Sequence, residues 1–464
     1  MAARPWPAYG ASPVPASRRQ SRASLLFLLR PSRVSHTLDH LRSGALRGLK
    51  RLSLNGLGLT AFPPEIFDEE LADTLEILDL SGNALDSLPE ELPRLHRLRI
   101  LFASGNRFTE LPAVLGRCPN LEMVGFKSNR IRHVSAAALP PRLRWLILTD
   151  NEIEALPAEI GRRSRLQKLA LAGNRLAALP AELAACTALE LLRVSANRLE
   201  TLPDWLPALP RLAWLAFAGN PMGEALERAV LTGTPTPALP WAELQLHERL
   251  GEGASGVIHR AAHRGAPLAL KLFKGEVTSD GWPRSEMAAW LAAGRHAHLI
   301  PVQGRIAGHP AGTEGLVMPL VGPEFRALAG PPSLDSCTRD VYAPDTRFDA
   351  AALRRLAGGI AAAVAQLHAR GITHGDLYAH NTLHGPQGMA YLGDFGAATL
   401  FAPDDPQAEA LQRVEARAFG CLLEELLARC DGPVPDEIPA LMRTCLVETP
   451  ADRPLFAAIA RALA

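Results

Sequence analysis

The 464-residue sequence contains little cysteine, no long apolar run and almost no net charge. Its six cysteines form no CxxC pair, which argues against a zinc site and a disulfide framework and favours a reducing compartment such as the cytoplasm. A formal charge of +1 with 47% hydrophobic residues indicates neither a nucleic-acid-binding protein nor a disordered chain. No apolar stretch approaches the roughly 18–20 residues of a membrane-spanning helix, so no membrane span is expected. The length favours two domains.

Residues 1–37 differ from the rest of the chain. They are rich in Arg, Ser, Pro and Ala, and no acidic residue precedes Asp39. An arginine-rich, acid-poor segment resembles an organelle-targeting presequence. A disordered tail or a start codon assigned too far upstream explains the same composition, and we expect one of these two, because richness in Ala, Arg, Leu and Pro runs through the whole chain.

A repeat fills the first half of the sequence. Segments such as LEILDLSGNAL (75–85) and LQKLALAGNRL (166–176) recur, with asparagines at positions 83, 106, 129, 151, 174, 197 and 220, a spacing of 22 or 23 residues. A degenerate unit at 49–59 adds an eighth copy. One such unit cannot bury its apolar face alone, so stacked neighbours supply the core. The period and the LxxLxLxxN pattern resemble the leucine-rich repeat, which implies an α/β solenoid over residues 38–231.

The variable positions between the leucines of such a solenoid face its concave surface. Here they include Phe102, Met123, Lys127, Trp145, Ile147, Thr149, Arg193 and Trp214. Exposed aromatic and arginine side chains often anchor protein interfaces, so this face is predicted to bind a protein substrate or ligand, and no nucleic acid. The alternative is that some of these rings pack against neighbouring strands or against the C-terminal half.

A proline-rich segment separates the two halves. Residues 232–243 begin with TGTPTPALP, which has three prolines and no periodicity, and they predict a linker. The following residues, 244–464, contain short motifs that carry chemistry. The first fits GxGxxGxV between two strand-like runs, where small residues let a hairpin lie close over phosphates, and consists of Gly251, Gly253, Gly256 and Val257.

Further motifs follow in a fixed order. The segment LALK places Lys271 on the next strand, and Glu286, 15 residues later in a helix-like run, is its natural ion-pair partner. HGDLYAHN (374–381) contains an Asp and an Asn five residues apart, and DFG follows at 394–396. Near the end, CLVETPADRP contains an arginine at position 453.

In this order the motifs resemble a eukaryotic-like protein kinase of the bacterial type, with a two-lobed α+β fold. The resemblance implies ATP and Mg²⁺ as cofactors. Lys271 would hold the α- and β-phosphates with Glu286 orienting it, and Met318 would lie near the adenine. Asp376 would be the catalytic base. The resemblance assigns metal binding to Asn381 and Asp394.

Three departures from the family pattern bear on activity. Gly375 replaces the arginine that usually precedes the catalytic Asp and clamps an activation-loop phosphate. Tyr378 stands where serine/threonine kinases usually carry a lysine, so Lys274, His380 or a residue elsewhere would have to supply the positive charge. The segment after Asp394 reaches EARAFG at position 415, 21 residues on, with no APE motif, so the platform for a peptide substrate is short.

The sequence thus predicts an ATP- and Mg²⁺-dependent protein kinase acting on serine or threonine, with a solenoid that selects a protein partner or substrate. Deleting the solenoid is then expected to spare ATP turnover and to abolish transfer to the target. Two alternatives stay open. The chain is a catalytically weak pseudokinase scaffold, or, since HGDLxxxN also resembles aminoglycoside and choline kinases, a small-molecule phosphotransferase.

Overall fold

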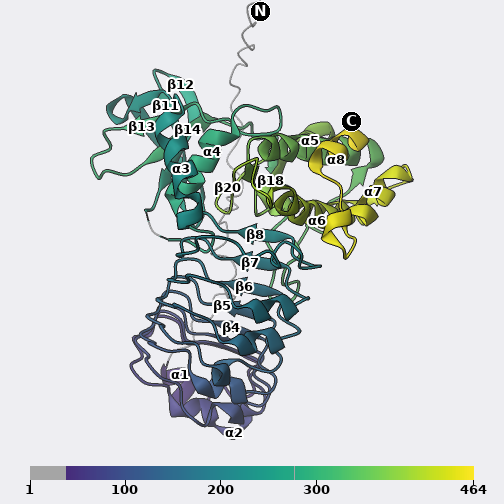
Figure 1. Ribbon diagram of the computed structural model, residues 1–464. Helices are drawn as coiled ribbons and strands as arrows, with labels where there is room; N and C mark the ends of the chain where they lie inside the picture. The colour runs from purple at the N-terminus through teal and green to yellow at the C-terminus, as the bar shows by residue number, and fades with distance from the viewer. Residues whose placement is uncertain (1–37, 276) are drawn as a thin grey trace, which may run out of the picture.

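The computed structural model describes residues 38–275 and 277–464, so the expectations for residues 1–37 lie outside its range. Figure 1 shows a curved solenoid with a two-lobed body seated on its C-terminal end. This is the fold class that the sequence predicted: a leucine-rich repeat solenoid followed by a two-lobed α+β domain. In the described part of the chain, no helix is both long enough and apolar enough to cross a membrane.

Eight short parallel strands, paired in sequence order, line the concave face of the solenoid. They are β1 (Arg51–Ser53), β2 (Ile77–Asp79), β3 (Ile100–Phe102), β4 (Met123–Gly125), β5 (Trp145–Ile147), β6 (Lys168–Ala170), β7 (Leu191–Arg193) and β8 (Trp214–Ala216). Helix α1 (Leu38–Arg42) precedes the first strand. The return segments between strands contain η2 (Pro64–Phe67), α2 (Glu69–Ala72), η3 (Leu92–Arg94), η4 (Ala113–Arg117), η5 (Ala136–Ala138), η6 (Ala158–Arg162) and η7 (Ala181–Ala185).

Leucines and asparagines hold the repeats together. The repeat leucines form one continuous core along the solenoid. The Nδ2 of Asn174 donates to the carbonyls of Leu148 and Leu171, and its Oδ1 accepts from the backbone N–H of Ile153. The equivalent asparagines repeat these bonds, so backbone groups buried at each turn are satisfied.

The segment predicted as a linker contributes to the second domain. Helix α3 (Pro221–Gly233) packs against α4 (Pro283–Ala293), and Ser285 Oγ donates to Glu227 Oε2 at 2.8 Å. Strand β9 (Ala238–Pro240) pairs in parallel with β13, and η8 (Trp241–Glu243) follows it. Residues 232–243 therefore include an edge strand of the N-terminal lobe rather than a free connector.

The N-terminal lobe is a six-stranded sheet with the order β10-β11-β12-β14-β13-β9. Its strands after β9 are β10 (Leu244–Glu252), β11 (Gly256–His263), β12 (Ala266–Phe273), β13 (Gly304–Ala307) and β14 (Gly315–Pro319). Helix α4 is buried along most of its length, because it lies against this lobe, against α3, and against the short strands β17 (Ile372–Thr373) and β20 (Thr399–Leu400) of the C-terminal lobe.

The C-terminal lobe is mainly helical. Its helices are α5 (Ala350–Ala369), α6 (Ala408–Leu427), α7 (Glu437–Cys445) and α8 (Phe456–Leu463), with short turns η9 (Ala379–Asn381), η10 (Pro386–Gly388) and η11 (Pro450–Asp452). Its strands are β15 (Arg326–Ala327), β16 (Phe348–Asp349), β17 (Ile372–Thr373), β18 (Thr382–His384), β19 (Ala390–Leu392), β20 (Thr399–Leu400) and β21 (Cys430–Asp431).

The C-terminal lobe closes the open end of the solenoid. Phe401, Ala408, Leu411 and Val414, from the segment after β20 and from α6, belong to the same apolar core as the repeat leucines. The Nε2 of Gln407 donates to Asp204 Oδ1 at 2.7 Å. Solenoids need a terminal cap that covers their last repeat, and this lobe provides it.

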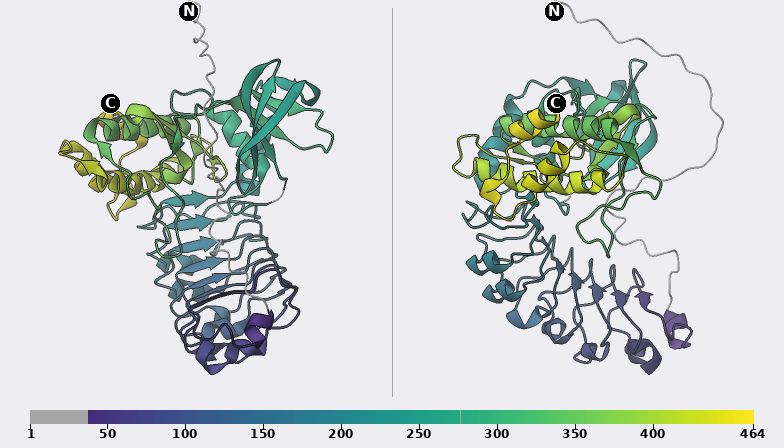
Figure 2. Two further views of the ribbon diagram at one scale, coloured as in Figure 1. Left: turned by 180° about the vertical axis from the view of Figure 1, so that it is seen from behind. Right: turned by 90° about the vertical axis from the view of Figure 1, so that its right-hand side faces the viewer.

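From β3 to β8, the concave face is mostly covered. Leu334 and Cys337, from a loop of the C-terminal domain, pack with the concave side chains Phe102, Met123 and Trp145. Figure 2 shows this loop running down from the two-lobed body along the inside of the curve. The prediction that the concave aromatics are exposed is wrong, because Phe102, Trp145 and Trp214 are each at most 4% exposed. The alternative, that they pack against the C-terminal half, is the observed arrangement.

Candidate active site

The nucleotide side of the site is organised around a buried ion pair. Lys271 on β12 pairs with Glu286 on α4, and the two residues are 5% and 1% exposed. Burial by itself lowers the pKa of Lys271, but the carboxylates of Glu286 and Asp394 together outweigh it and the pKa is raised, so the lysine stays charged. In protein kinases this pair must be in place for catalysis, and here it is formed.

The glycine motif forms the turn of the β10–β11 hairpin. The N–H of Gly253 donates to the carbonyl of Gly256 at 2.9 Å. A Cβ on Gly256 would lie 2.4 Å from the carbonyl oxygen of Leu272, so only glycine lets this strand approach β12. Val257 is the second residue of the outgoing strand, and Met318 is buried on β14, opposite Ala269 of β12.

Asp376 and Asn381 are held together in the catalytic loop, which comprises residues 374–381. The Nδ2 of Asn381 donates to the carbonyl of Asp376 at 2.9 Å and to its Oδ2 at 2.7 Å. Both amide protons of Asn381 are thereby used, which leaves its Oδ1 as the atom that can bind a cation. The carbonyl of Asn381 accepts from the N–H of Gly393 at 2.9 Å. This bond brings the next residue, Asp394, close to the catalytic loop.

Glu415 on α6 supports this loop, a role that sequence reasoning missed. Its Oε1 accepts from the N–H of Gly375 at 2.7 Å, and its Oε2 accepts from the N–H of His374 at 3.2 Å. His368 Nε2 lies 2.7 Å from the same carboxylate. Burial raises the pKa of Glu415, but these partners outweigh it and the pKa is lowered. The sequence offered no signal for this role, because Glu415 lies between Arg413 and Arg417 in a helix that contains several other charged residues.

The DFG segment links the catalytic loop to α4. Phe395 is fully buried and stacks on Trp290 of α4, with ring centroids 5.3 Å apart, while His374 lies against its other side at 5.4 Å. Asp394 has a positive φ of 55°, a conformation that few non-glycine residues adopt and that concentrates at functional sites. Its Oδ1 accepts from the N–H of Gly396 at 3.1 Å.

The residues assigned to the metal suit magnesium chemically. Mg²⁺ takes oxygen ligands and is usually held by one or two carboxylates together with substrate phosphates. Asp394 offers a carboxylate from the DFG segment, and Asn381 offers an amide oxygen from the catalytic loop. Among the residues that the structure describes, there is no cluster of three or more His, Cys, Asp or Glu side chains suited to another kind of metal site.

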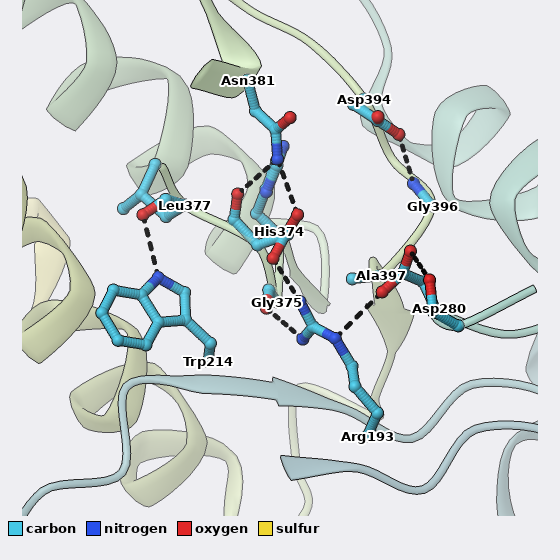
Figure 3. A network of polar contacts seen from close by, with 12 residues as sticks. Arg193, Trp214, Asp280, His374, Gly375, Leu377, Asn381, Asp394, Gly396 and Ala397 are labelled. Carbon is cyan, nitrogen blue, oxygen red and sulfur yellow. Dashed lines mark hydrogen bonds and ion pairs between the residues drawn. The ribbon is translucent and has the colours of Figure 1, made fainter. Parts of the chain in front are cut away.

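The solenoid enters the site through Arg193 on β7. Its guanidinium forms an ion pair with Asp376 Oδ1, donates to the carbonyl of Gly375 at 2.8 Å, and pairs with Asp280 Oδ1 at 3.0 Å. Figure 3 shows Arg193 between the catalytic loop and Asp280, which precedes α4. The sequence named Arg193 only as a concave-face residue, because nothing local ties it to Asp376, 183 positions later.

A second solenoid residue explains the unusual Tyr378. The rings of Trp214 on β8 and Tyr378 are stacked, with centroids 4.3 Å apart and planes within 5°. The Nε1 of Trp214 donates to the carbonyl of Leu377 at 3.1 Å, as Figure 3 shows. An aromatic side chain at 378 therefore joins the catalytic loop to the solenoid.

Arg453 also contacts the solenoid. It is buried in the C-terminal lobe, and its guanidinium donates to the carbonyls of Val447 at 3.1 Å and Pro210 at 2.6 Å. Pro210 lies in the last repeat. The solenoid therefore covers a surface of the C-terminal lobe next to residues 394–415, the segment that is short in the sequence and has no APE motif.

A glycine is required at position 375, where the catalytic loop lies against Leu215 of the solenoid. It has a φ of +70°, and a Cβ on it would lie 2.5 Å from the carbonyl oxygen of Ala397 and 2.7 Å from that of Leu215. We expect Gly375→Ala to lower the free energy of unfolding by about 1–3 kcal/mol more than Gly432→Ala. Gly432 has a similar φ of +88° but no atom within 4 Å of the added Cβ. Urea unfolding of both variants measures the difference, and equal losses would contradict a steric requirement.

Comparison with known proteins agrees with this geometry. Residues 244–416 match the model of the protein kinase domain, and residues 74–95 match that of the leucine-rich repeat. Serine/threonine-protein kinase mos of Xenopus laevis is 27% identical over 176 residues, which cover 37% of this chain and 46% of that protein. A putative cyclin-dependent kinase F-2 of Oryza sativa subsp. japonica is 28% identical over 203 residues, covering 39% of this chain and 60% of that protein.

Cyclin-dependent kinase 20 of Macaca mulatta is 28% identical over 211 residues, covering 44% of this chain and 78% of that protein. The chain thus spans about half the length of the first two relatives. The matched residues contain the glycine hairpin, the Lys271–Glu286 pair, the catalytic loop and the DFG segment described above. Residues 244–416 are therefore part of a protein kinase domain, which follows a leucine-rich repeat region in the same chain.

Proposed function

We propose that this protein is a serine/threonine protein kinase that uses ATP and Mg²⁺. The observation that carries the proposal is the simultaneous presence of the buried Lys271–Glu286 pair and of Asp376 held by Asn381. A domain that had lost catalysis would be free to lose either arrangement. The serine/threonine preference rests on one relative, serine/threonine-protein kinase mos of Xenopus laevis, whose name states it for that protein.

The side chains divide the work as follows. Lys271, fixed by Glu286, binds the α- and β-phosphates, and the glycine hairpin from Gly251 to Val257 covers them while Met318 lies by the adenine. Asn381 and Asp394 would hold Mg²⁺, which neutralises charge that develops on the phosphates. Asp376 orients the acceptor hydroxyl and takes its proton.

The solenoid restricts how a protein partner can bind. Strands β3 to β8 carry concave side chains that are mostly buried against the kinase domain. Arg51 on β1 is exposed, and Ser53 and Ile77 on β1 and β2 are partly exposed. We propose that a protein partner uses this first part of the concave face. All six cysteines are unpaired, which is consistent with a reducing compartment such as the cytoplasm.

The test is phosphate transfer from γ-labelled ATP with Mg²⁺, using purified full-length protein and casein as acceptor, and separating labelled protein from labelled small molecules. We expect label on serine or threonine that disappears in Asp376→Asn and persists in Asp436→Asn, an exposed aspartate ahead of α7. Label confined to small alcohols would instead identify a small-molecule phosphotransferase. Absence of label with intact ATP binding would identify a pseudokinase scaffold.

A further inference from the structure

The catalytic loop, residues 374–381, contains no lysine or arginine. Tyr378 occupies the position where the family pattern places a lysine, and Gly375 the position of an arginine. The other basic candidates near the loop are engaged elsewhere. Lys274 Nζ lies 2.7 Å from Glu252 Oε1, and His380 Nδ1 lies 2.7 Å from Asp340 Oδ1. In the described part of the chain, the arginine or lysine that pairs with Asp376 is Arg193.

Arg193 is built into the site. The residue is 4% exposed, and each of its three guanidinium nitrogens has a partner in the kinase domain: Gly375, Asp376 and Asp280. A buried guanidinium is costly unless it is paired and its donors are satisfied, and these contacts meet that condition. Two of the three contacts are on the catalytic loop, and the third is on the loop that leads into α4.

The contacts leave acceptor sites free on the Asp376 carboxylate. Arg193 binds Oδ1 and Asn381 binds Oδ2, while a carboxylate has about four acceptor sites. The bonds from Arg193 and Asn381 fix the rotation of the carboxylate without using all its lone pairs. An acceptor hydroxyl can therefore still donate to it.

We propose that Arg193 is a positioning residue of the phosphotransfer site, through which the solenoid supplies the fixed positive charge that the catalytic loop lacks. The inference rests on the proposed kinase function. Because one guanidinium joins the catalytic loop to the loop before α4, the solenoid also fixes the base relative to the helix that carries Glu286. The solenoid is then part of the active site as well as a surface for partners.

The experiment compares full-length wild type with Arg193→Met, Arg193→Lys and a matched control, Arg175→Met. Arg175 also lies on the solenoid, but its ion-pair partner is Glu152 of the solenoid itself. The measurements are kcat and KM for ATP in casein phosphorylation with Mg²⁺, together with the melting temperature. For Arg193→Met we expect kcat to fall about 10²-fold with KM for ATP within about 2-fold, since the charge acts on the base and not on the nucleotide.

Arg193→Lys should recover part of this loss, because it restores the charge but not the three-way geometry, and Arg175→Met should match wild type. An unchanged kcat in folded Arg193→Met overturns the proposal. A raised kcat also overturns it, by showing that Arg193 obstructs Asp376. A change that appears only in KM for ATP would assign Arg193 to nucleotide binding and would likewise overturn the proposal.

Removing Arg193 leaves Asp376 and Asp280 without their cation, which can prevent folding. In that case Arg193→Met is combined with Asp280→Asn. Arg193→Lys keeps the charge and is measured as a single variant, for which we expect kcat to fall about 10-fold. Wild-type kcat in Arg193→Lys would then overturn the proposal. If wild type itself transfers no phosphate, the kinase function fails and this inference fails with it. An active wild type with an equally active Arg193→Met removes this inference alone.

Discussion

Lys271→Met is expected to lower kcat/KM for phosphate transfer by about 10²- to 10³-fold, and to lower stability as well. The activity loss follows from removing the cation that holds the phosphates. The stability loss follows from Glu286, which is 1% exposed and would keep a buried charge without a partner. Breaking a buried pair by removing one member costs about 3–5 kcal/mol.

The double variant Lys271→Met with Glu286→Gln separates the two effects. Glutamine carries no charge, so the melting temperature should return towards that of wild type while the activity stays low. Thermal unfolding and initial rates with Mg-ATP measure both quantities on the same samples. Recovery of activity in the double variant, or a single variant as stable as wild type, would be incompatible with the role given to this pair. Lys50→Met is a suitable control, because its partner Glu76 is at the surface of the solenoid.

Removing the solenoid is expected to unfold the kinase domain. A fragment of residues 221–464 keeps α3 and β9 but loses β1 to β8. It would expose Phe401, Leu411 and Val414, which belong to the solenoid core, and it would leave the buried carboxylate of Asp376 without Arg193. These losses together approach the 5–15 kcal/mol that stabilise a typical domain. The expected result is an aggregated or unfolded fragment that does not bind ATP.

This result would be opposite to the interpretation of the solenoid as a separable targeting module, under which its deletion spares ATP turnover. Circular dichroism, gel filtration and nucleotide binding of the fragment provide the measurement. A soluble fragment that unfolds cooperatively and binds Mg-ATP would refute the dependence of the kinase domain on the solenoid.

In the full chain, Leu411→Ser should lower the melting temperature, because Leu411 belongs to the solenoid core. Glu409→Ser on the same helix should not lower it, since Glu409 is 64% exposed and its pair with Arg413 contributes little to stability.

Local patterns made much of the fold predictable. The 22- or 23-residue spacing specifies one repeat at a time, and each asparagine bonds within its own turn and the turn before it. The kinase motifs are likewise short segments whose order along the chain is informative. The Lys271–Glu286 pair joins residues only 15 positions apart, and the structure brings them together as the spacing indicated.

The contacts between the two halves could not be predicted in this way. Arg193 meets Asp376 across 183 positions, and Trp214 meets Leu377 across 163. Such pairs follow from how the domains dock, and neither periodicity nor motif spacing encodes docking. The sequence did contain their counterpart, since Gly375 and Tyr378 depart from the kinase pattern at two positions that contact the solenoid. A departure that weakens a motif locally can therefore mark the place where a distant residue contributes.

The capping of the solenoid by α6 has a consequence for synthesis on the ribosome. Protein domains generally begin to fold in the order in which they emerge, so the repeats appear first. Their last strand, β8, keeps an apolar end until Phe401, Leu411 and Val414 have been translated. The nascent chain thus carries an unfinished hydrophobic surface while most of the kinase domain is being made. Completion of the solenoid and assembly of the catalytic loop then become a single late event.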